Sequence, residues 1–437
     1  MIVLLALLLL VLCMVVGIPI PLSFLASAAL VCLVDGSSPI MLFSYGFNNM
    51  NSVLLLSIPL FVLAGSLIDK GGLGEKLIGG LYKLCRGSKA ALGTVTIIAC
   101  AVFGAVSGSS SATLSCIGSI MEPRLREAGY KPGLIGGVLA SSGVLGIMIP
   151  PSILMILYAW GTGASVLACF LSTIIPGIIL VVLFSLVNAY FVKKTIPATA
   201  SAGPAPAAAA VNTALDGKKK KEKSAIPAIL MPILLLGSIY TGVLTATEGA
   251  AFTVLYSAVV GALFYRRLDR ASFKEAMIAA GRTSGVIMTM LFSVGILSRL
   301  YLTEDLPDLV LGFLTSISDN RVVILLMVNL FMVFIGMLMD DCSGTTLCGP
   351  LLLPIMMALD VTPVHFAAIL SVNIGMGNVT PPTAPLLYLG GRIANAEVKD
   401  MLKPTFALIL FAWLPTLLLT TFIPQLSLFL PQLFGYV

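Results

Sequence analysis

The chain has 437 residues, of which 58% are hydrophobic and only 10% charged, and its mean hydropathy is +1.08. An ordinary soluble domain has an apolar share nearer half and a charged share of about a quarter, so the composition excludes that class. Apolar runs near the ~20 residues that a helix needs to cross a bilayer recur along the chain, without the alternation of barrel strands. We therefore expect an all-α polytopic membrane protein.

The first 34 residues contain no Lys or Arg, so the basic region of a cleavable signal peptide is missing and the segment should stay in the membrane. An interruption at Gly17 to Pro21 favours two crossings over one long kinked helix. At an offset of about 231 positions this segment aligns with residues 232–265, which are interrupted around Glu248. We expect Glu248 to be a turn or helix-start acid rather than a proton carrier.

Three basic clusters, at positions 70–89, 124–131 and 266–282, are expected on the cytoplasmic side by the positive-inside rule. Residues 71–89 also mix charges with apolar side chains as an amphipathic helix at the membrane surface does. Residues 303–318 occupy the matching place in the second half of the chain. We expect these two matching segments to brace a fixed frame of helices around a moving core.

Between two of the basic clusters lies an apolar segment, residues 90–121, which is interrupted by the serine-rich sequence 107–111. Because both flanks should be cytoplasmic, this segment must enter the membrane and return as a re-entrant helical hairpin. A broken helix is expected at residues 133–164, and residues 165–192 then lead back to the cytoplasm. Residues 1–192 form the first predicted repeat.

A basic connector, residues 193–225, separates the two halves and carries most of the net charge of +6 in Lys218, Lys219, Lys220, Lys221 and Lys223. Its Ala, Pro and Gly content predicts a solvated cytoplasmic linker. Contact with anionic membrane lipid is possible for such a tract, and nucleic-acid binding is not expected.

The second predicted repeat, residues 226–437, contains a hairpin at 322–358 and a broken helix at 363–392. Pro381-Pro382 corresponds there to Pro150-Pro151 of the first repeat. Each half has about five crossings and one hairpin, an odd number, so we expect inverted repeats with the second hairpin entering from the periplasm. Duplicated halves with Gly/Pro-interrupted helices are typical of secondary transporters.

The hairpin tips and the helix breaks predict two Na⁺ sites, because proline cannot donate to the carbonyls of Gly146, Ile147, Gly377 and Asn378. The first site is predicted from Ser107, Ser110, Ser111, Thr113, Gly143 and Gly146, near Ser141 and Ser142. The second is predicted from Asp340, Ser343, Gly344, Thr346, Asn373, Gly375, Gly377 and Asn378, with Asp341 as an alternative charge partner. The competing interpretation is that these small and hydroxyl residues allow close helix packing.

Arg299 is a candidate anchor for a substrate carboxylate, because it lies near the end of an apolar run and is expected to face the second hairpin. It could instead snorkel to the interface or pair with Glu304 or Asp305. Four hydroxyl residues complete the predicted substrate site: Ser109, Ser110, Thr345 and Thr380. The sequence contains no catalytic constellation, so we do not expect an enzyme.

Three motifs resemble the large membrane (M) subunit of TRAP (tripartite ATP-independent periplasmic) transporters. They are Ser107 to Thr113, Gly146 to Ser152 and Asn373 to Thr383. The resemblance covers essentially the whole chain and implies a Na⁺-coupled, elevator-type importer of organic acids in the bacterial inner membrane. It also implies a small membrane (Q) subunit, expected as a separate chain, and a periplasmic substrate-binding protein (P subunit).

The resemblance carries the sodium roles onto the Ser, Thr, Gly and Asn positions named above, and a similarly placed arginine contacts the substrate carboxylate. Sialic acid is favoured over a C4-dicarboxylate. Two alternatives remain: a proton-coupled carrier that depends on Asp340, Asp341 or Glu248, and a membrane scaffold that transports nothing.

Overall fold

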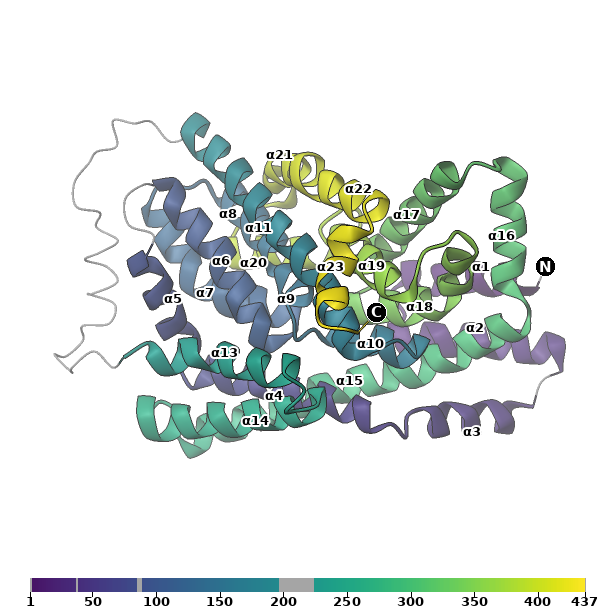
Figure 1. Ribbon diagram of the computed structural model, residues 1–437, viewed down its shortest axis with the longest axis horizontal. Helices are drawn as coiled ribbons and strands as arrows, with labels where there is room; N and C mark the ends of the chain where they lie inside the picture. Colours follow the sequence, from purple (N-terminus) through teal and green to yellow (C-terminus); the bar gives the residue numbers. More distant parts are fainter. Residues whose placement is uncertain (1, 37, 85–88, 196–223, 437) are drawn as a thin grey trace.

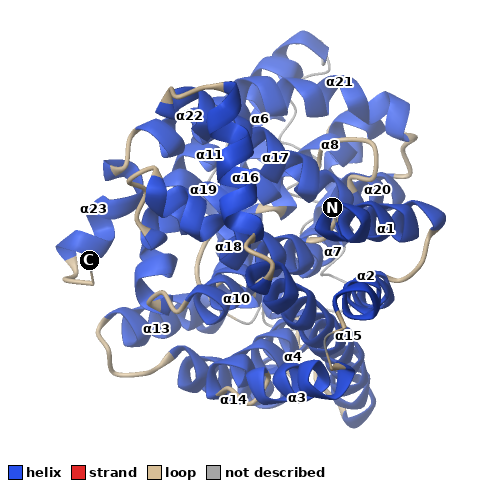
Figure 2. Ribbon diagram, turned by 90° about the vertical axis from the view of Figure 1, so that its right-hand side faces the viewer, coloured by secondary structure: helices blue, strands red, loops and turns tan. Residues whose placement is uncertain are grey.

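The computed structural model describes residues 2–36, 38–84, 89–195 and 224–436, and every regular element in these ranges is a helix (Figures 1 and 2). Within them, seven helical segments are long and apolar enough to cross a membrane. A pair bent by 46°, Pro132–Met148 with Ile153–Thr162, makes an eighth. The prediction of an all-α polytopic membrane protein is confirmed. The predicted linker 193–225 lies largely outside the described residues.

Long helices from the beginning of each half of the chain form an outer layer along one side of the molecule (Figure 1). They are α1 (Ile2–Val16), α2 (Ile20–Asp35), α3 (Pro39–Asn49), α4 (Ser57–Lys70, after a 3₁₀ turn at Val53–Leu56), α13 (Ile226–Tyr240), α14 (Ala246–Val259, continued by a π turn at Val260–Tyr265) and α15 (Arg270–Thr303). The 34-residue α15 packs against α2, α3 and α4, and α4 also packs against α14.

Both predicted interruptions in this layer are helix boundaries. The first lies at Gly17, whose φ of +90° ends α1. At the second, the Thr245 hydroxyl accepts the Glu248 N–H at 3.3 Å, and the Glu248 carboxylate accepts the Thr245 N–H at 2.8 Å. This reciprocal capping box starts α14. Glu248 is therefore a helix-start acid, as the sequence predicts.

An inner layer holds a helical hairpin and a broken helix from each half of the chain. The first half supplies α6 (Lys89–Ser107), α7 (Ser110–Glu127), α8 (Pro132–Gly143), α9 (Leu145–Met148) and α10 (Ile153–Thr162), and the second supplies α17 (Arg321–Leu338), α18 (Asp341–Ala358), α19 (Pro363–Gly377) and α20 (Pro385–Ala394). These helices lie where the sequence places its hairpins and breaks. The halves interlock, because α10 packs on α18 and α20 packs on α7 and α8. Inverted insertion of the halves stays a prediction.

The remaining helices flank the inner layer. They are α5 (Leu73–Leu84), α11 (Val166–Thr195), α16 (Leu306–Ile317), α21 (Val398–Leu408, continued by a π turn at Ile409–Trp413), α22 (Leu414–Phe422) and α23 (Gln425–Leu433). The predicted arms are α5 and α16, which lie at opposite ends of Figure 1. α5 packs on α6 and α13, and α16 packs on α15 and α18.

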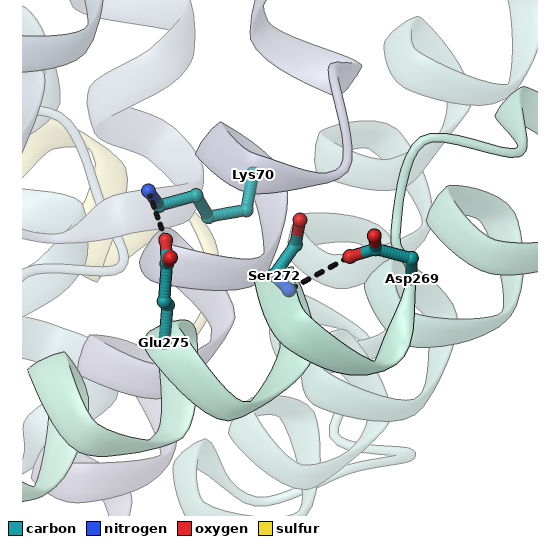
Figure 3. Close-up of polar contacts among 4 residues, drawn as sticks. All are labelled: Lys70, Asp269, Ser272 and Glu275. Carbon is teal, nitrogen blue, oxygen red and sulfur yellow. Dashed lines mark hydrogen bonds and ion pairs between the residues drawn. The ribbon is translucent and has the colours of Figure 1, made fainter.

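The end of α4 and the start of α15, which carry residues of two predicted basic clusters, are joined by an ion pair (Figure 3). Lys70 Nζ is 2.9 Å from Glu275 Oε2, and Asp269 caps α15 by accepting the Ser272 N–H at 2.8 Å. That hydrogen bond from Ser272 lowers the pKa of Asp269 below its usual value. Two of the three predicted basic clusters therefore share one end of the molecule.

Candidate cation and substrate site

The tip of the first hairpin is a two-residue turn between α6 and α7. Gly108 adopts the left-handed backbone (φ +61°) that glycine tolerates best, and the Ser109 hydroxyl accepts the Ala112 N–H at the start of α7. Across the turn, the hydroxyls of Ser107 and Thr113 lie 2.9 Å apart and are hydrogen-bonded. Ser, Thr and Gly thus concentrate oxygen atoms at the tip.

The first broken helix is held directly against this tip. The Ile153 N–H donates to the Gly108 carbonyl at 3.1 Å, which joins the start of α10 to the turn. A Cβ atom at Gly146 would lie 2.6 Å from the Ser109 carbonyl oxygen, so only glycine permits this approach. At Gly143, a Cβ would meet the Ser110 carbonyl oxygen at 3.4 Å. The structure therefore brings the first predicted residue set together.

The second tip begins with two consecutive aspartates that point to different partners. Asp340 caps α18: its carboxylate accepts the Cys342 N–H at 3.2 Å and the hydroxyl proton of Ser343. The neighbouring Asp341 accepts hydrogen bonds from the Ser110 hydroxyl and the Asn378 side-chain amide. Asp341 thus connects the first hairpin tip to the second broken helix, and its carboxyl group lies at the centre of the site.

Close backbone contact also fixes the second break. A Cβ at Gly377 would lie 2.6 Å from the Gly336 Cα atom, so α19 touches α17 backbone to backbone. The chain then passes through a Pro381-Pro382 cis peptide, as it does at Pro150-Pro151 in the first break. The two breaks are thus built alike, at the spacing found in the sequence.

Three of the four carbonyls predicted to be free of donors have donors. The Ile147 carbonyl accepts the Ser152 hydroxyl at 2.6 Å, the Gly377 carbonyl accepts the Thr380 N–H at 2.9 Å, and the Asn378 carbonyl accepts the Leu386 N–H at 3.3 Å. Only the Gly146 carbonyl has no donor within the described part of the chain. The prediction is wrong for the other three, because the Ser152 hydroxyl and the N–H groups of Thr380 and Leu386 replace the donors that the prolines lack.

Several predicted ligands make packing contacts instead. The Asn373 amide donates to Asn329 Oδ1 at 2.7 Å and to the Ile369 carbonyl, and Gly375 faces Trp413. The Thr346 and Thr380 hydroxyls donate to carbonyls one turn earlier in the chain. Among the residues of the two predicted sites, the described structure gives no hydrogen-bond partner to the buried side-chain oxygens of Ser141, Ser142, Thr345, Asn373 and Asn378.

A cavity of about 240 Å³ lies between the first tip and the outer layer. Its lining includes Ser107, Ser109, Ser111 and Asp341 from the predicted set, together with Gly108. The sequence analysis missed three further polar residues there: Ser66 of α4, Ser115 of α7 and Thr283 of α15. Ser115 lies one helical turn after Ser111, and this spacing could have predicted that both side chains lie on the same face of α7. The facing side chains of α4 and α15 gave no comparable signal.

Arg299 does not face the second hairpin. Its guanidinium lies over the ring of Tyr45 on α3, 5.5 Å from the ring centroid, and it is exposed. Met290, on the same helix, contacts Ser343 at the second tip, so Arg299 lies about 14 Å further along the axis at 1.5 Å per residue. Its alternative pairing with Glu304 or Asp305 is not formed either. Within the described residues, no carboxylate is bound to Arg299.

Two hairpin tips and two broken helices surround the partly buried Asp341 carboxyl group in an all-helical membrane protein, which is the architecture of a membrane transporter. The family described as "Tripartite ATP-independent periplasmic transporter, DctM component" matches residues 7–426. The chain belongs to this family, so the resemblance to the large membrane subunit of TRAP transporters is confirmed.

Several curated relatives carry specific names. The chain is 29% identical to the isethionate TRAP transporter permease protein DctMQ of Oleidesulfovibrio alaskensis, over 95% of this chain and 64% of that protein. It is 28% identical to the sialic acid TRAP transporter large permease protein SiaM of Vibrio cholerae, over 89% of each. It is 29% identical to the C4-dicarboxylate TRAP transporter large permease protein DctM of Pseudomonas aeruginosa, over 89% of this chain and 88% of that protein.

Two solved structures share the fold at low sequence identity. The YdaH transporter of Alcanivorax borkumensis has a TM-score of 0.59 at 15% identity, over 89% of this chain and 88% of the other. MtrF of Neisseria gonorrhoeae has a TM-score of 0.59 at 13% identity, over 90% and 86%. At these identities the likeness concerns the fold alone.

Proposed function

We propose that the chain is the membrane-spanning carrier of a sodium-coupled importer that takes up an organic acid by an elevator movement. In this proposal the inner layer moves as one unit against the outer layer. The two hairpin tips and their broken helices hold the coupling ions. The substrate binds in the cavity between the layers.

The contact network at Asp341 carries the proposal. This carboxylate joins the first tip, through Ser110, to the second break, through Asn378. A negative charge among hydroxyl, amide and carbonyl oxygens is a suitable environment for a hard cation such as Na⁺, which needs oxygen ligands. A bound cation would offset the cost of this partly buried charge and order both unwound segments.

Sodium and substrate would then be linked. If Na⁺ orders the tip that lines the cavity, the affinity for the acid rises with sodium, and the affinity for sodium rises equally with the acid. The Gly146 carbonyl and the buried hydroxyls of Ser141 and Ser142 supply further acceptors near the first tip. The number of sodium sites proposed is at least two.

The substrate is an organic acid, since relatives are named for isethionate, sialic acid and C4-dicarboxylates. Identities of 28% and 29% do not separate the last two. The cavity of about 240 Å³ is smaller than the ~300–1,000 Å³ of common ligand pockets. We propose that the layers separate before an acid enters, and we retain sialic acid as the first substrate to test.

The partners follow the TRAP plan, with a small membrane subunit as a separate chain and a periplasmic substrate-binding protein. The name of the DctMQ relative joins M and Q in one protein, so a fused arrangement also exists in the family. The proposed location is the bacterial inner membrane, with residues 193–225 in the cytoplasm.

The decisive experiment is uptake into liposomes that contain the chain and a Q subunit, with binding proteins and labelled acids supplied in turn outside. An inward sodium gradient should drive accumulation of one acid only when its binding protein is present. Failure of every acid under a sodium gradient would support the non-transporting scaffold.

A second candidate, proton coupling, is favoured by one observation: the partly buried Asp341 carboxyl has no cationic partner in the described structure and could carry a proton. In that case uptake would follow a pH gradient in sodium-free buffer, and Asp341→Asn would abolish it. If transport is coupled to sodium instead, a pH gradient alone should drive no uptake of the acid.

A further inference from the structure

A second and larger cleft, of about 1,370 Å³, lies between α11 and α21 and is not part of the candidate transport site. Its floor is the start of α8, at Pro132 to Leu134. The walls are side chains from one face of each flanking helix, because they recur at helical spacing: Leu183, Leu186, Val187, Tyr190, Phe191 and Lys194 on α11, and Asp400, Lys403, Pro404, Ala407 and Phe411 on α21.

The cleft is polar at one end and apolar at the other. Lys194 is the last side chain on its wall of α11, Lys403 lies at the middle of α21, one turn before Ala407, and Lys131 directly precedes α8. Apolar side chains follow from these lysines toward Leu183 on one wall and Phe411 on the other. The long axis of the cleft therefore runs from a cationic rim to an apolar interior.

The depth of the cleft matches one leaflet of a membrane. From Lys194 to Leu183 the α11 wall covers 11 residues, or about 16 Å at 1.5 Å per residue. Half of a ~30 Å hydrocarbon core is ~15 Å. α11 has 30 residues, so at about 45 Å it is long enough to carry Lys194 to the level of the headgroups.

Three lysines and two acidic residues lie at the rim, so its net charge is positive and can attract an anion. Within the described residues, Lys131 and Lys403 have no ion pair, and Lys194 lies over the Tyr190 ring at 5.8 Å. Of the two acids at the rim, Glu397 is paired with Lys399 at 2.6 Å, which leaves Asp400 as the only opposing charge. The neighbouring segment 196–223 is itself basic, so its charge does not complement this rim.

From these observations we infer that the cleft binds a phospholipid with an anionic headgroup. Its phosphate lies among Lys131, Lys194 and Lys403, and its acyl chains lie between the apolar walls of α11 and α21. Basic pockets between membrane helices recognise such headgroups by charge. The exposed aromatic rings of Tyr190 and Phe411 provide contact area for the chains.

The test is titration of the intact protein in detergent with phosphatidylglycerol and with phosphatidylcholine of the same chains, followed by native mass spectrometry. The variant Lys131→Gln/Lys194→Gln/Lys403→Gln removes the three charges and keeps a polar side chain, one atom shorter, at each position. It should bind phosphatidylglycerol at least about tenfold more weakly, with phosphatidylcholine little changed. The charge-matched control Lys76→Gln/Lys193→Gln/Lys274→Gln, none of which lines the cleft, should bind as the wild type does.

A second variant, Ala407→Trp, fills the apolar wall without changing charge and should also weaken phosphatidylglycerol binding. Unchanged binding in both cleft variants would overturn the inference, as would an equal loss in the charge-matched control. Competition by inorganic phosphate alone at similar concentration would assign the rim to a soluble anion and would also overturn it.

Discussion

At the scale of single residues, the two consecutive aspartates show how neighbours in sequence acquire different tasks. Asp340 is satisfied locally as a helix cap, whereas Asp341 reaches Ser110 in the other half of the chain. The sequence places both at the second tip but leaves the choice between them open. Which of them crosses to the first tip depends on how α18 is rotated about its axis, and tertiary packing determines that rotation.

Replacing Ser110 with alanine removes one of the two donors to Asp341. A hydrogen bond to a charged group contributes about 1.5–3 kcal/mol, so the sodium concentration for half-maximal uptake should rise by about tenfold or more. Sodium titration of liposome uptake measures this shift. Ser119→Ala is the matched control, because Ser119 is exposed on the same helix and donates only to the Cys116 carbonyl. Identical sodium curves for both variants would leave Ser110 a packing residue.

Arg299 supports a separate prediction, because an arginine in a membrane helix without a bound carboxylate is costly and usually functional. If it anchors the substrate acid, Arg299→Ala should reduce uptake at least about tenfold while the amount of protein in the membrane is unchanged, since the paired donors are lost. Arg282→Ala, an exposed arginine of the same helix, should transport normally. Normal uptake by the Arg299 variant would identify a snorkelling side chain stacked on Tyr45.

At the scale of elements, helices end close to the Gly, Ser and Pro residues that interrupt the apolar runs, whereas re-entry of the hairpins into the membrane stays a prediction. The prediction of freed carbonyls failed where Ser152, Thr380 and Leu386, on either side of the prolines, supply the donors. The contacts of Asn373 with Asn329 and of Arg299 with Tyr45 were also unpredictable. Each joins helices distant in sequence, and the periodicity of one helix does not specify its neighbour.

The contact between α17 and α19 gives a prediction about stability. A methyl group at Gly377 would lie 2.5 Å from the Gly336 carbonyl carbon, and backbone cannot rotate away as a side chain can. Gly377→Ala should therefore lower the stability by about 1–3 kcal/mol, the usual cost of overpacking, which a thermal unfolding midpoint in detergent can detect. Gly285→Ala is the control, because nothing lies within 4 Å of its Cβ position. A similar midpoint for both variants would show that the two helices can separate freely.

At the scale of the whole molecule, the proposed movement requires that the inner and outer layers slide past each other. Ser66 of α4 and Ser115 of α7 line the same cavity from the two layers. In a background without reactive cysteines, Ser66→Cys with Ser115→Cys joined by a short thiol crosslinker should stop uptake, and cleavage of the crosslink should restore it. Each single variant treated alike should remain active. Full transport by the crosslinked protein would exclude relative motion at this contact.

The bond between Ser110 and Asp341 has a consequence for ancestry. Its donor belongs to one half of the chain and its acceptor to the other, so neither half alone contains the complete constellation. A half-length ancestor would have needed a second polypeptide to complete the site. Fusion of the two genes would have placed both parts of the site in one chain. Co-production of residues 1–195 and 224–437 as two separate polypeptides would recreate this partnership in the laboratory.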